Sequence, residues 1–172
     1  MGWKNVKEHY RIEHIVHVNE KGICIGSGYI TDLIVIGLDG RIKKRCDSSN
    51  NDDLNRYLSE MDSDSGMLEK LVKSQDKFDK SITVYTYDDG AIIEKQCETL
   101  GWPNVTNDGE LMYKNTHSAD RSIIVDIAKR NAAARIKMIG ESIKRAEIEL
   151  DERIKMLDKS KSDLAKLEAE NG

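Results

Sequence analysis

Proline, phenylalanine and cysteine are scarce in this 172-residue chain, which holds one proline, one phenylalanine and three cysteines. The single proline excludes collagen-like, mucin-like and proline-rich linker proteins. The chain also lacks an apolar run close to the roughly 20 residues that span a bilayer, and its N-terminus lacks the apolar core of a signal peptide. The isolated Cys24, Cys46 and Cys97 argue against a disulfide framework and are typical of a reducing compartment. We therefore expect a cytoplasmic protein that makes no membrane contact.

Charge is plentiful but unevenly distributed along the chain. Lys, Arg, Asp and Glu make up 34% of the residues, and the formal net charge is −4. Residues 1–45 carry 8 basic and 5 acidic side chains, whereas residues 46–115 carry 7 basic and 15 acidic ones, a net of −8. Residues 135–172 carry 9 of each sign, which is typical of a solvated helix with many ion pairs. The middle third is therefore the acidic part of the protein.

The first third of the chain predicts β-structure. Residues 10–18 mix alternation with β-branched side chains, and residues 33–36 form the continuous apolar run typical of a central strand. Asp39-Gly40 is a strong signal for a two-residue hairpin of type I′, which needs positive φ at both positions. We expect an antiparallel meander of three or four strands over residues 10–45.

The next segment predicts two short helices. Residues 47–53 are polar and supply side chains that suit turns and helix N-caps. Apolar residues then recur at helical spacing over residues 54–61 and again over residues 67–72. We expect one helix from each of these two stretches.

A strand and a third helix are expected to follow. Residues 81–87 are β-branched and aromatic, which favours a strand. Asp88-Asp89-Gly90 resembles a helix cap, and the spacing of Ile92, Ile93 and Cys97 is helical. The sequence therefore predicts a helix that begins after Gly90 and is stopped by Gly101.

The C-terminal third predicts one long helix, because residues 118–170 contain no proline and one glycine, Gly140. Five apolar residues recur every seven positions from Ile136, and several of the residues three positions after them are also apolar, which indicates a coiled coil over about residues 136–167. At about 1.5 Å per residue, a continuous helix would be about 75–80 Å long. A globular body of about 115 residues is roughly 30–35 Å across and cannot cover it.

These patterns together predict an α+β protein with a mostly antiparallel sheet, short helices and a long C-terminal coiled-coil-like helix. We expect a globular domain over residues 1–117 and the helix over residues 118–172. Either the helix folds back near Gly140 or a second copy covers its apolar side. The segment near Gly140 lacks turn residues, so we favour a homodimer. The predicted dimerisation residues are Ile136, Ile139, Ile143, Ala146, Leu150, Leu157, Leu164 and Leu167.

Residues that resemble catalytic or metal-binding motifs do not have the required spacing. His14 and His17 point to opposite faces of a strand, so with His9 they are expected to be exposed strand histidines rather than metal ligands. The glycines in residues 22–28 precede a strand and not the helix N-terminus of a phosphate-binding loop. Residues 62–66 place their glycine wrongly for a calcium loop. We therefore expect no metal, no cofactor and no enzymatic activity.

Lys43, Lys44 and Arg45 form the main basic cluster and are the candidate nucleic-acid contacts. Nucleic-acid-binding domains usually have a larger basic surface and often a pI above about 9. The pI of this chain is about 5.6. Direct nucleic-acid binding is therefore disfavoured.

Several stretches resemble an uncharacterised family of small accessory proteins encoded by phages and prophages. The clearest is Leu100-Gly-Trp-Pro-Asn-Val-Thr-Asn-Asp-Gly-Glu-Leu-Met-Tyr113, and the others are residues 21–27, 32–41, 84–97 and 128–134. Together they cover 52 of the 172 residues, just under a third of the chain. The resemblance implies a phage accessory gene and gives no reaction or site residues.

We expect a phage-encoded, non-enzymatic interaction protein, a homodimer that binds and inhibits a host protein such as a CRISPR or other anti-phage defence complex. The acidic middle third would face a basic groove of that partner, which complementary charge would favour. One alternative is a small protein that binds nucleic acid or nucleotides, and another is a structural or assembly component of a phage. The candidate partner-binding residues are Asp52, Asp53, Asp62 and Asp64.

Overall fold

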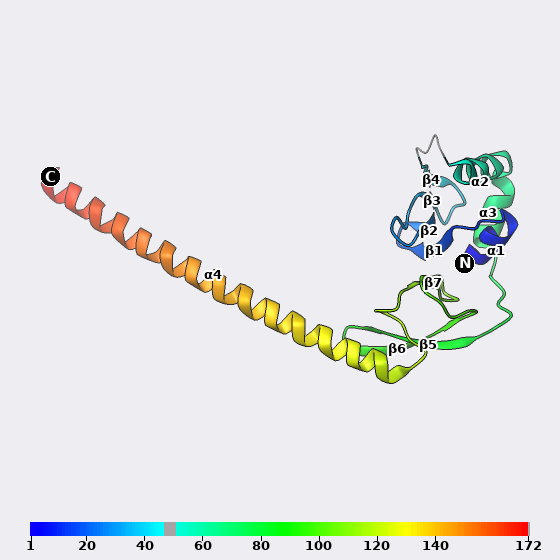
Figure 1. Cartoon of the computed structure of the whole chain (residues 1–172). Coiled ribbons are helices and arrows are strands. Elements are labelled where there is room, and N and C mark those ends of the chain that lie inside the picture. The colour runs from blue at the N-terminus through cyan, green and yellow to red at the C-terminus, as the bar shows by residue number, and fades with distance from the viewer. Residues whose placement is uncertain (47–50, 172) are drawn as a thin grey trace. The chain divides into compact units, whose positions relative to one another are not determined.

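The computed structural model of the protein describes residues 1–46 and 51–171 (Figure 1). The chain divides into two compact units, Met1–Ile127 and Ala128–Gly172. The predicted turn at residues 47–50 lies outside the described residues. None of the described helices is both long enough and apolar enough to cross a membrane.

The first unit contains a four-stranded antiparallel sheet in the order β1-β2-β3-β4, so the predicted meander is confirmed. Every residue of β2 and β3 is buried, as expected of strands at the centre of a sheet. The strands are Ile15–Asn19 (β1), Gly22–Gly26 (β2), Ile34–Ile36 (β3) and Ile42–Lys44 (β4).

Three short helices contribute to the core of this sheet. The predicted helices are confirmed as α2 (Asp52–Ser63) and α3 (Ser65–Lys73). Asn51 caps α2 by accepting a hydrogen bond from the Leu54 N–H, so one of the polar residues expected to cap this helix does so. Buried side chains of the helices, including Leu54, Tyr57 and Leu68, join those of the sheet in one apolar cluster.

Helix α1 (Trp3–His9) was not predicted, because its N-terminus has no local capping residue. Its cap comes instead from Asp76, more than 70 positions away. The Asp76 carboxylate accepts hydrogen bonds from the backbone N–H groups of Lys4 (3.1 Å) and Asn5 (2.9 Å). Trp3 and Val6 are buried in the core cluster, so tertiary contacts stabilise a seven-residue helix that would not form alone.

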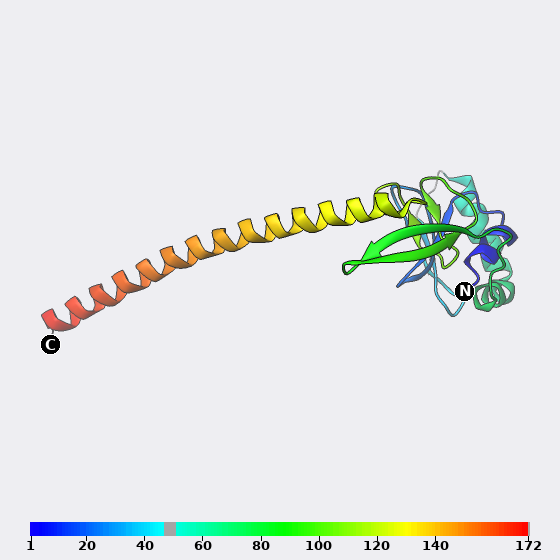
Figure 2. The same cartoon turned by 90° about the horizontal axis from the view of Figure 1, so that it is seen from below.

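The helix predicted after Gly90 is wrong, because this segment is the second strand of a hairpin (Figure 2). Strands β5 (Ile82–Asp88) and β6 (Ala91–Cys97) pair antiparallel from Ile82 opposite Cys97 to Asp88 opposite Ala91. The connecting Asp89 and Gly90 have φ values of 43° and 81°. Positive φ at both positions is the requirement of a type I′ turn, which matches the twist of the two strands.

The hairpin predicted at Asp39-Gly40 is confirmed, but its turn is not of type I′. Gly40 has a φ of 76°, whereas Arg11 and Asp89 are the non-glycine residues with positive φ in the part of the chain described. The loop is longer than two residues, since β3 ends at Ile36 and β4 begins at Ile42. The Gly37 N–H donates to the Arg41 carbonyl (2.8 Å) and closes it.

The rest of the first unit is a small hairpin and the start of the long helix. The hairpin consists of β7 (Asn104–Val105) and β8 (Leu111–Met112). Ser118 and Tyr85 exchange backbone hydrogen bonds of 2.7 and 3.0 Å, which fixes the segment before the helix against β5. Ile124 and Ile127 are buried, so the first turns of the helix belong to this unit, ten residues beyond the boundary predicted at residue 117.

Helix α4 (Arg121–Asn171) confirms the predicted long C-terminal helix. It continues through Gly140 without interruption, so the chain does not fold back at that residue. Asp120 lies just before it and accepts a hydrogen bond from the Ser122 N–H (2.8 Å). This acceptor satisfies one of the N–H groups that lack an intrahelical partner at a helix start.

The two turn glycines provide a test of how the hairpins are held. A Cβ at Gly90 would meet no atom within 4 Å, whereas a Cβ at Gly40 would lie 2.4 Å from Cα of Glu69. We expect Gly90→Ala to lower the free energy of unfolding by about 1–2 kcal/mol, from the positive φ alone. Gly40→Ala should cost about 1–3 kcal/mol more, because it also forces the hairpin away from α3. Urea unfolding of both variants measures the difference, and equal losses would contradict the contact with α3.

Candidate functional site

The apolar residues predicted to mediate dimerisation are exposed along α4. We call this set of eight residues the α4 seam. The largest exposed fraction, 72%, belongs to Ile136, and Ile139 has the smallest of the large side chains, 47%. Its members are Ile136, Ile139, Ile143, Ala146, Leu150, Leu157, Leu164 and Leu167.

The spacing of the α4 seam separates it from ordinary scattered surface residues. Single exposed leucines and isoleucines are common on soluble proteins. Here five large side chains recur every seven residues from Ile136 to Leu164, which is the period of a coiled-coil contact and not of a solvated face. Arg153 and Ser160 interrupt the second row, and Ile154 is exposed next to Arg153. The arrangement can bury a stripe against another helix.

The four candidate acidic residues lie in α2 and at the junction of α2 and α3, and all four are exposed. Asp62 forms a bidentate ion pair with Arg45, with both N···O distances 2.7 Å. Asp64 caps α3 by accepting a hydrogen bond from the Met67 N–H (3.1 Å). Asp52 and Asp53 occupy the first turn of α2, where the helix dipole favours negative charge. Two of the four therefore have structural roles inside the unit.

The candidate basic residues are exposed, and two of the three pair with acids. Lys44 lies 3.1 Å from Asp32, and Arg45 is the partner of Asp62. Lys21 also contacts Asp32 (2.8 Å), and the hydrogen bonds from Lys21 and then Lys44 lower the pKa of that carboxyl to about 2. Two of the three candidate phosphate contacts, Lys44 and Arg45, are therefore already engaged in ion pairs within the unit.

The histidines and cysteines lie apart. The prediction of exposed strand histidines is wrong for all three. His9 is exposed but lies in α1, His14 is half-buried, and His17 is buried in β1 with its Nε2 2.9 Å from the Thr31 carbonyl oxygen. His14 lies 3.4 Å from the Tyr57 hydroxyl, just before β1. Cys24 and Cys97 are buried free thiols. Among the described residues, no group of three His, Cys, Asp or Glu side chains is placed to hold a metal ion.

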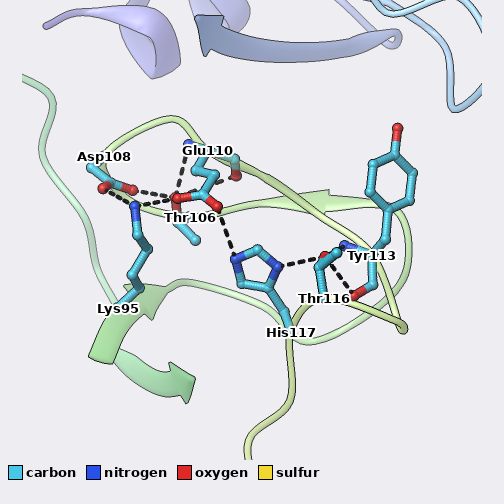
Figure 3. A network of polar contacts seen from close by, with 7 residues as sticks. All are labelled: Lys95, Thr106, Asp108, Glu110, Tyr113, Thr116 and His117. Carbon is cyan, nitrogen blue, oxygen red and sulfur yellow. Dashed lines mark hydrogen bonds and ion pairs between the residues drawn. The ribbon is translucent and has the colours of Figure 1, made fainter. Parts of the chain in front are cut away.

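A polar network that the sequence did not reveal connects β6 to the loop between β7 and β8 and to His117 (Figure 3). Lys95 of β6 forms ion pairs with Asp108 (2.6 Å) and with Glu110. The Glu110 carboxylate lies between Lys95 and the His117 ring, whose Nε2 is 3.5 Å away. On the other side of that ring, Nδ1 is 2.9 Å from the Thr116 hydroxyl.

The charges of this network are held in fixed states. Burial lowers the pKa of Lys95, but hydrogen bonds with Asp108 and Glu110 outweigh burial and leave it above its usual 10.5. Burial raises the pKa of Asp108, but the Lys95 and Thr106 bonds leave it below its usual value. A charged lysine between carboxylates binds the loop to β6 and does not provide a proton donor at neutral pH. We interpret the network as structural.

His117 is the exception, because its imidazole is buried, with a 1% exposed fraction, and none of the described residues forms a hydrogen bond with its Nε2. Burial lowers its pKa below the usual 6.5, and the Glu110 charge opposes this shift only in part. The neutral ring is therefore the folded form at neutral pH. Protonation requires a charge to be placed in a buried position.

A cleft of about 430 Å³ lies beside α1 and is lined in part by Trp3, Lys4, Phe78 and Glu98. Lys4 lies 2.7 Å from Glu98 and 5.2 Å from the centre of the Phe78 ring. Glu98 also accepts a hydrogen bond from the Asp79 N–H (2.8 Å). The volume of the cleft is in the range of small-molecule sites. Because Glu98 and Lys4 are bonded to each other, we assign no ligand to this cleft.

The buried His117 predicts a pH dependence of stability. Its folded-state pKa lies below the unfolded value of 6.5, so the unfolded chain binds the proton more readily. The contribution of the neutral His117 to the free energy of unfolding is fully present above pH 6.5. It is lost as the pH falls from 6.5 through the folded-state pKa. Urea unfolding between pH 7.5 and pH 5 should show a smaller decline for His117→Gln than for the wild type. The exposed His9→Gln is the control, and the same pH profile in the wild type and His117→Gln would contradict the assignment.

Comparison of the chain with protein-family models, with curated proteins and with solved structures found no match in any of the three. The resemblance to phage-encoded accessory proteins therefore stays a prediction from the sequence. The function has to be argued from the geometry of the described residues.

Proposed function

We propose that the protein is a non-enzymatic interaction protein that forms a homodimer through the α4 seam. The observation that supports this most directly is the seven-residue recurrence of exposed Ile and Leu side chains along an uninterrupted helix. A helix with an apolar stripe gains most of its stability from packing that stripe against a partner. A second copy presents the same stripe at the same spacing, so it is a self-complementary partner.

The energies involved are sufficient for a dimer. Fully burying a Leu or Ile side chain contributes roughly 1.5–3 kcal/mol, and the α4 seam has seven such side chains in each chain. Association costs roughly 4–15 kcal/mol of lost motion. If each of the fourteen side chains in a dimer gains half of that contribution, the sum is roughly 10–21 kcal/mol, which exceeds the cost of association over most of its range. The polar Arg153 and Ser160 reduce the margin without removing it.

Replacing one residue of the α4 seam tests the dimer. Leu157→Glu places a charge in the contact, and we expect it to raise the dimer dissociation constant at least 100-fold, which is about 3 kcal/mol. Ile148→Glu is the matched control, since Ile148 is exposed on the same helix but outside the seven-residue rows. Sedimentation equilibrium at 1–100 μM measures both. A monomeric wild type at tens of micromolar would reject the proposal, as would equal effects of the two variants.

We further propose that the dimer binds and inhibits a host protein through the acidic surface of its first unit. The net charge of −8 over residues 46–115 supports this, and so does the exposure of Asp52 and Asp53. Two acidic surfaces in a dimer would engage a basic groove, such as one that holds nucleic acid in a defence complex. The ion pairs Lys44–Asp32 and Arg45–Asp62 argue against the alternative of direct nucleic-acid binding.

Charge substitution tests the acidic surface. Proteins captured from host-cell lysate by the full-length chain are identified, and association is measured with the purified partner. We expect Asp52→Asn with Asp53→Asn to slow association several-fold, and 1 M salt to do the same, because the screening length falls from about 10 Å at 0.1 M salt to about 3 Å at 1 M. Asp88→Asn with Asp89→Asn is the control, an equal charge change at the exposed β5–β6 turn. If neither salt nor any of these substitutions changes the association rate, the acidic residues only keep the protein soluble.

A further inference from the structure

We propose that the two α4 helices of the dimer run antiparallel, with Ile136 of one copy opposite Leu167 of the other. This inference rests on the homodimer proposed above and adds the orientation of its partner. It is drawn from the residues that each orientation would bring together on the exposed surface of α4.

The core rows follow from the α4 seam. The first row contains the residues at seven-residue intervals from Ile136 to Leu164, and the second row lies three residues later and includes Arg153 and Ser160. In a parallel pair each residue faces its own copy, whereas in an antiparallel pair the first row faces the second. With Ile136 opposite Leu167, the remaining antiparallel layers are Ile139–Leu164, Ile143–Ser160, Ala146–Leu157 and Leu150–Arg153.

Arg153 favours the antiparallel orientation. A parallel pair brings the two Arg153 guanidinium groups together in the core, where like charges repel. The antiparallel pair places Arg153 against Leu150 of the second copy, next to Glu149 of that copy, and offsets the two Arg153 residues by three residues, about 4.5 Å, along the helix axis. Within its own chain Arg153 already lies 2.6 Å from Glu149. Each guanidinium then has one carboxylate from each helix.

The residues that flank the core lead to the same orientation. In a parallel pair, residues at positions e and g of neighbouring heptads meet across the interface. This brings Asp163 of one helix beside Glu168 of the other, which is a repulsive contact. With the first core row at position a and the second at position d, Arg135, Asp163 and Glu170 are g positions and Glu168 is an e position. In the antiparallel pair g positions of the two helices meet, and Arg135 lies near Glu170 of the second copy. The parallel pair therefore has a contact between like charges beside its core, whereas the antiparallel pair has a contact between opposite charges.

The charge of the two ends of the paired segment also differs. Residues 132–146 hold four basic and one acidic side chains, a net of +3, and residues 157–171 hold three basic and four acidic ones, a net of −1. An antiparallel pair places the basic end against the acidic end, whereas a parallel pair places +3 against +3. Charged flanking residues are the features that set orientation in coiled coils.

Apolar contact favours the parallel orientation instead. The parallel pair keeps Ile143 opposite Ile143 and Leu150 opposite Leu150, while the antiparallel pair faces them with Ser160 and Arg153. Arg153 limits this advantage, because its long apolar stem can cover Leu150 while its charged head reaches water. In the parallel pair the two core arginines share one layer, whereas in the antiparallel pair they lie in adjacent layers and each has a carboxylate from both helices.

Spin labels at two positions of α4 distinguish the orientations in the full-length protein. The labels are attached to Lys137→Cys or to Glu152→Cys, both exposed positions, in a Cys46→Ser background because Cys24 and Cys97 are buried. In the antiparallel pair position 152 faces position 151, so its two labels are close in either orientation. Position 137 faces position 166, 29 residues away, so its labels should be about 43 Å apart at 1.5 Å per residue. A parallel pair would place them roughly 10–20 Å apart, since paired helices lie about 8–10 Å from each other.

The two labels separate the failure of this inference from the failure of the dimer. A short distance at position 152 together with about 43 Å at position 137 supports the antiparallel pair. Short distances at both positions overturn it and leave a parallel homodimer. No dipolar interaction at position 152 with protein at 100 μM overturns the homodimer itself, and the orientation with it.

Discussion

An apolar stripe on a helix in water is the physical constraint on which the proposed behaviour of this protein depends. Most peptide groups of α4 are satisfied by the helix itself, but its Ile and Leu side chains in the described part of Ala128–Gly172 remain about half-exposed or more. Burial of those side chains in the proposed dimer would offset the cost of bringing two chains together. The charged residues of the helix, nine of each sign over residues 135–172, are typical of a solvated helix surface.

The sequence predicted the elements whose signal is local and periodic. The meander of β1–β4, the two helices after Asn51 and the long α4 were all visible as alternation or helical spacing. The hairpin β5–β6 was missed because Asp-Gly is both a helix-capping and a turn sequence, and Ile92 and Ile93 fit either period. Helix α1 was missed because its cap, Asp76, comes from a distant segment. Such information exists only once the chain has folded.

The same distinction applies to the candidate sites. The residues of the α4 seam were found because a seven-residue spacing can be counted in the sequence. The pairing of Arg45 with Asp62 could not be predicted from the sequence, because each residue belongs to a separate charged cluster along the chain. Lys95 and His117 are 22 positions apart, and only the folding of the β7–β8 loop brings them to the same carboxylate, Glu110. Runs of charged residues in a sequence therefore predict the net charge of a segment, but not which of its charged side chains form ion pairs after folding.

Gly140 has a consequence for the motion of α4. Glycine in a helix interior costs about 1 kcal/mol relative to alanine, and no atom outside the local helix lies near enough to compensate for the missing side chain. We therefore expect the weakest backbone hydrogen bonds in this part of α4 to lie around Gly140, between Ile139 and Ile143. Transient local opening there would let amide protons exchange with solvent faster than in the neighbouring turns. A helix that is continuous on average can in this way bend at one defined residue while the rest of its length stays stiff.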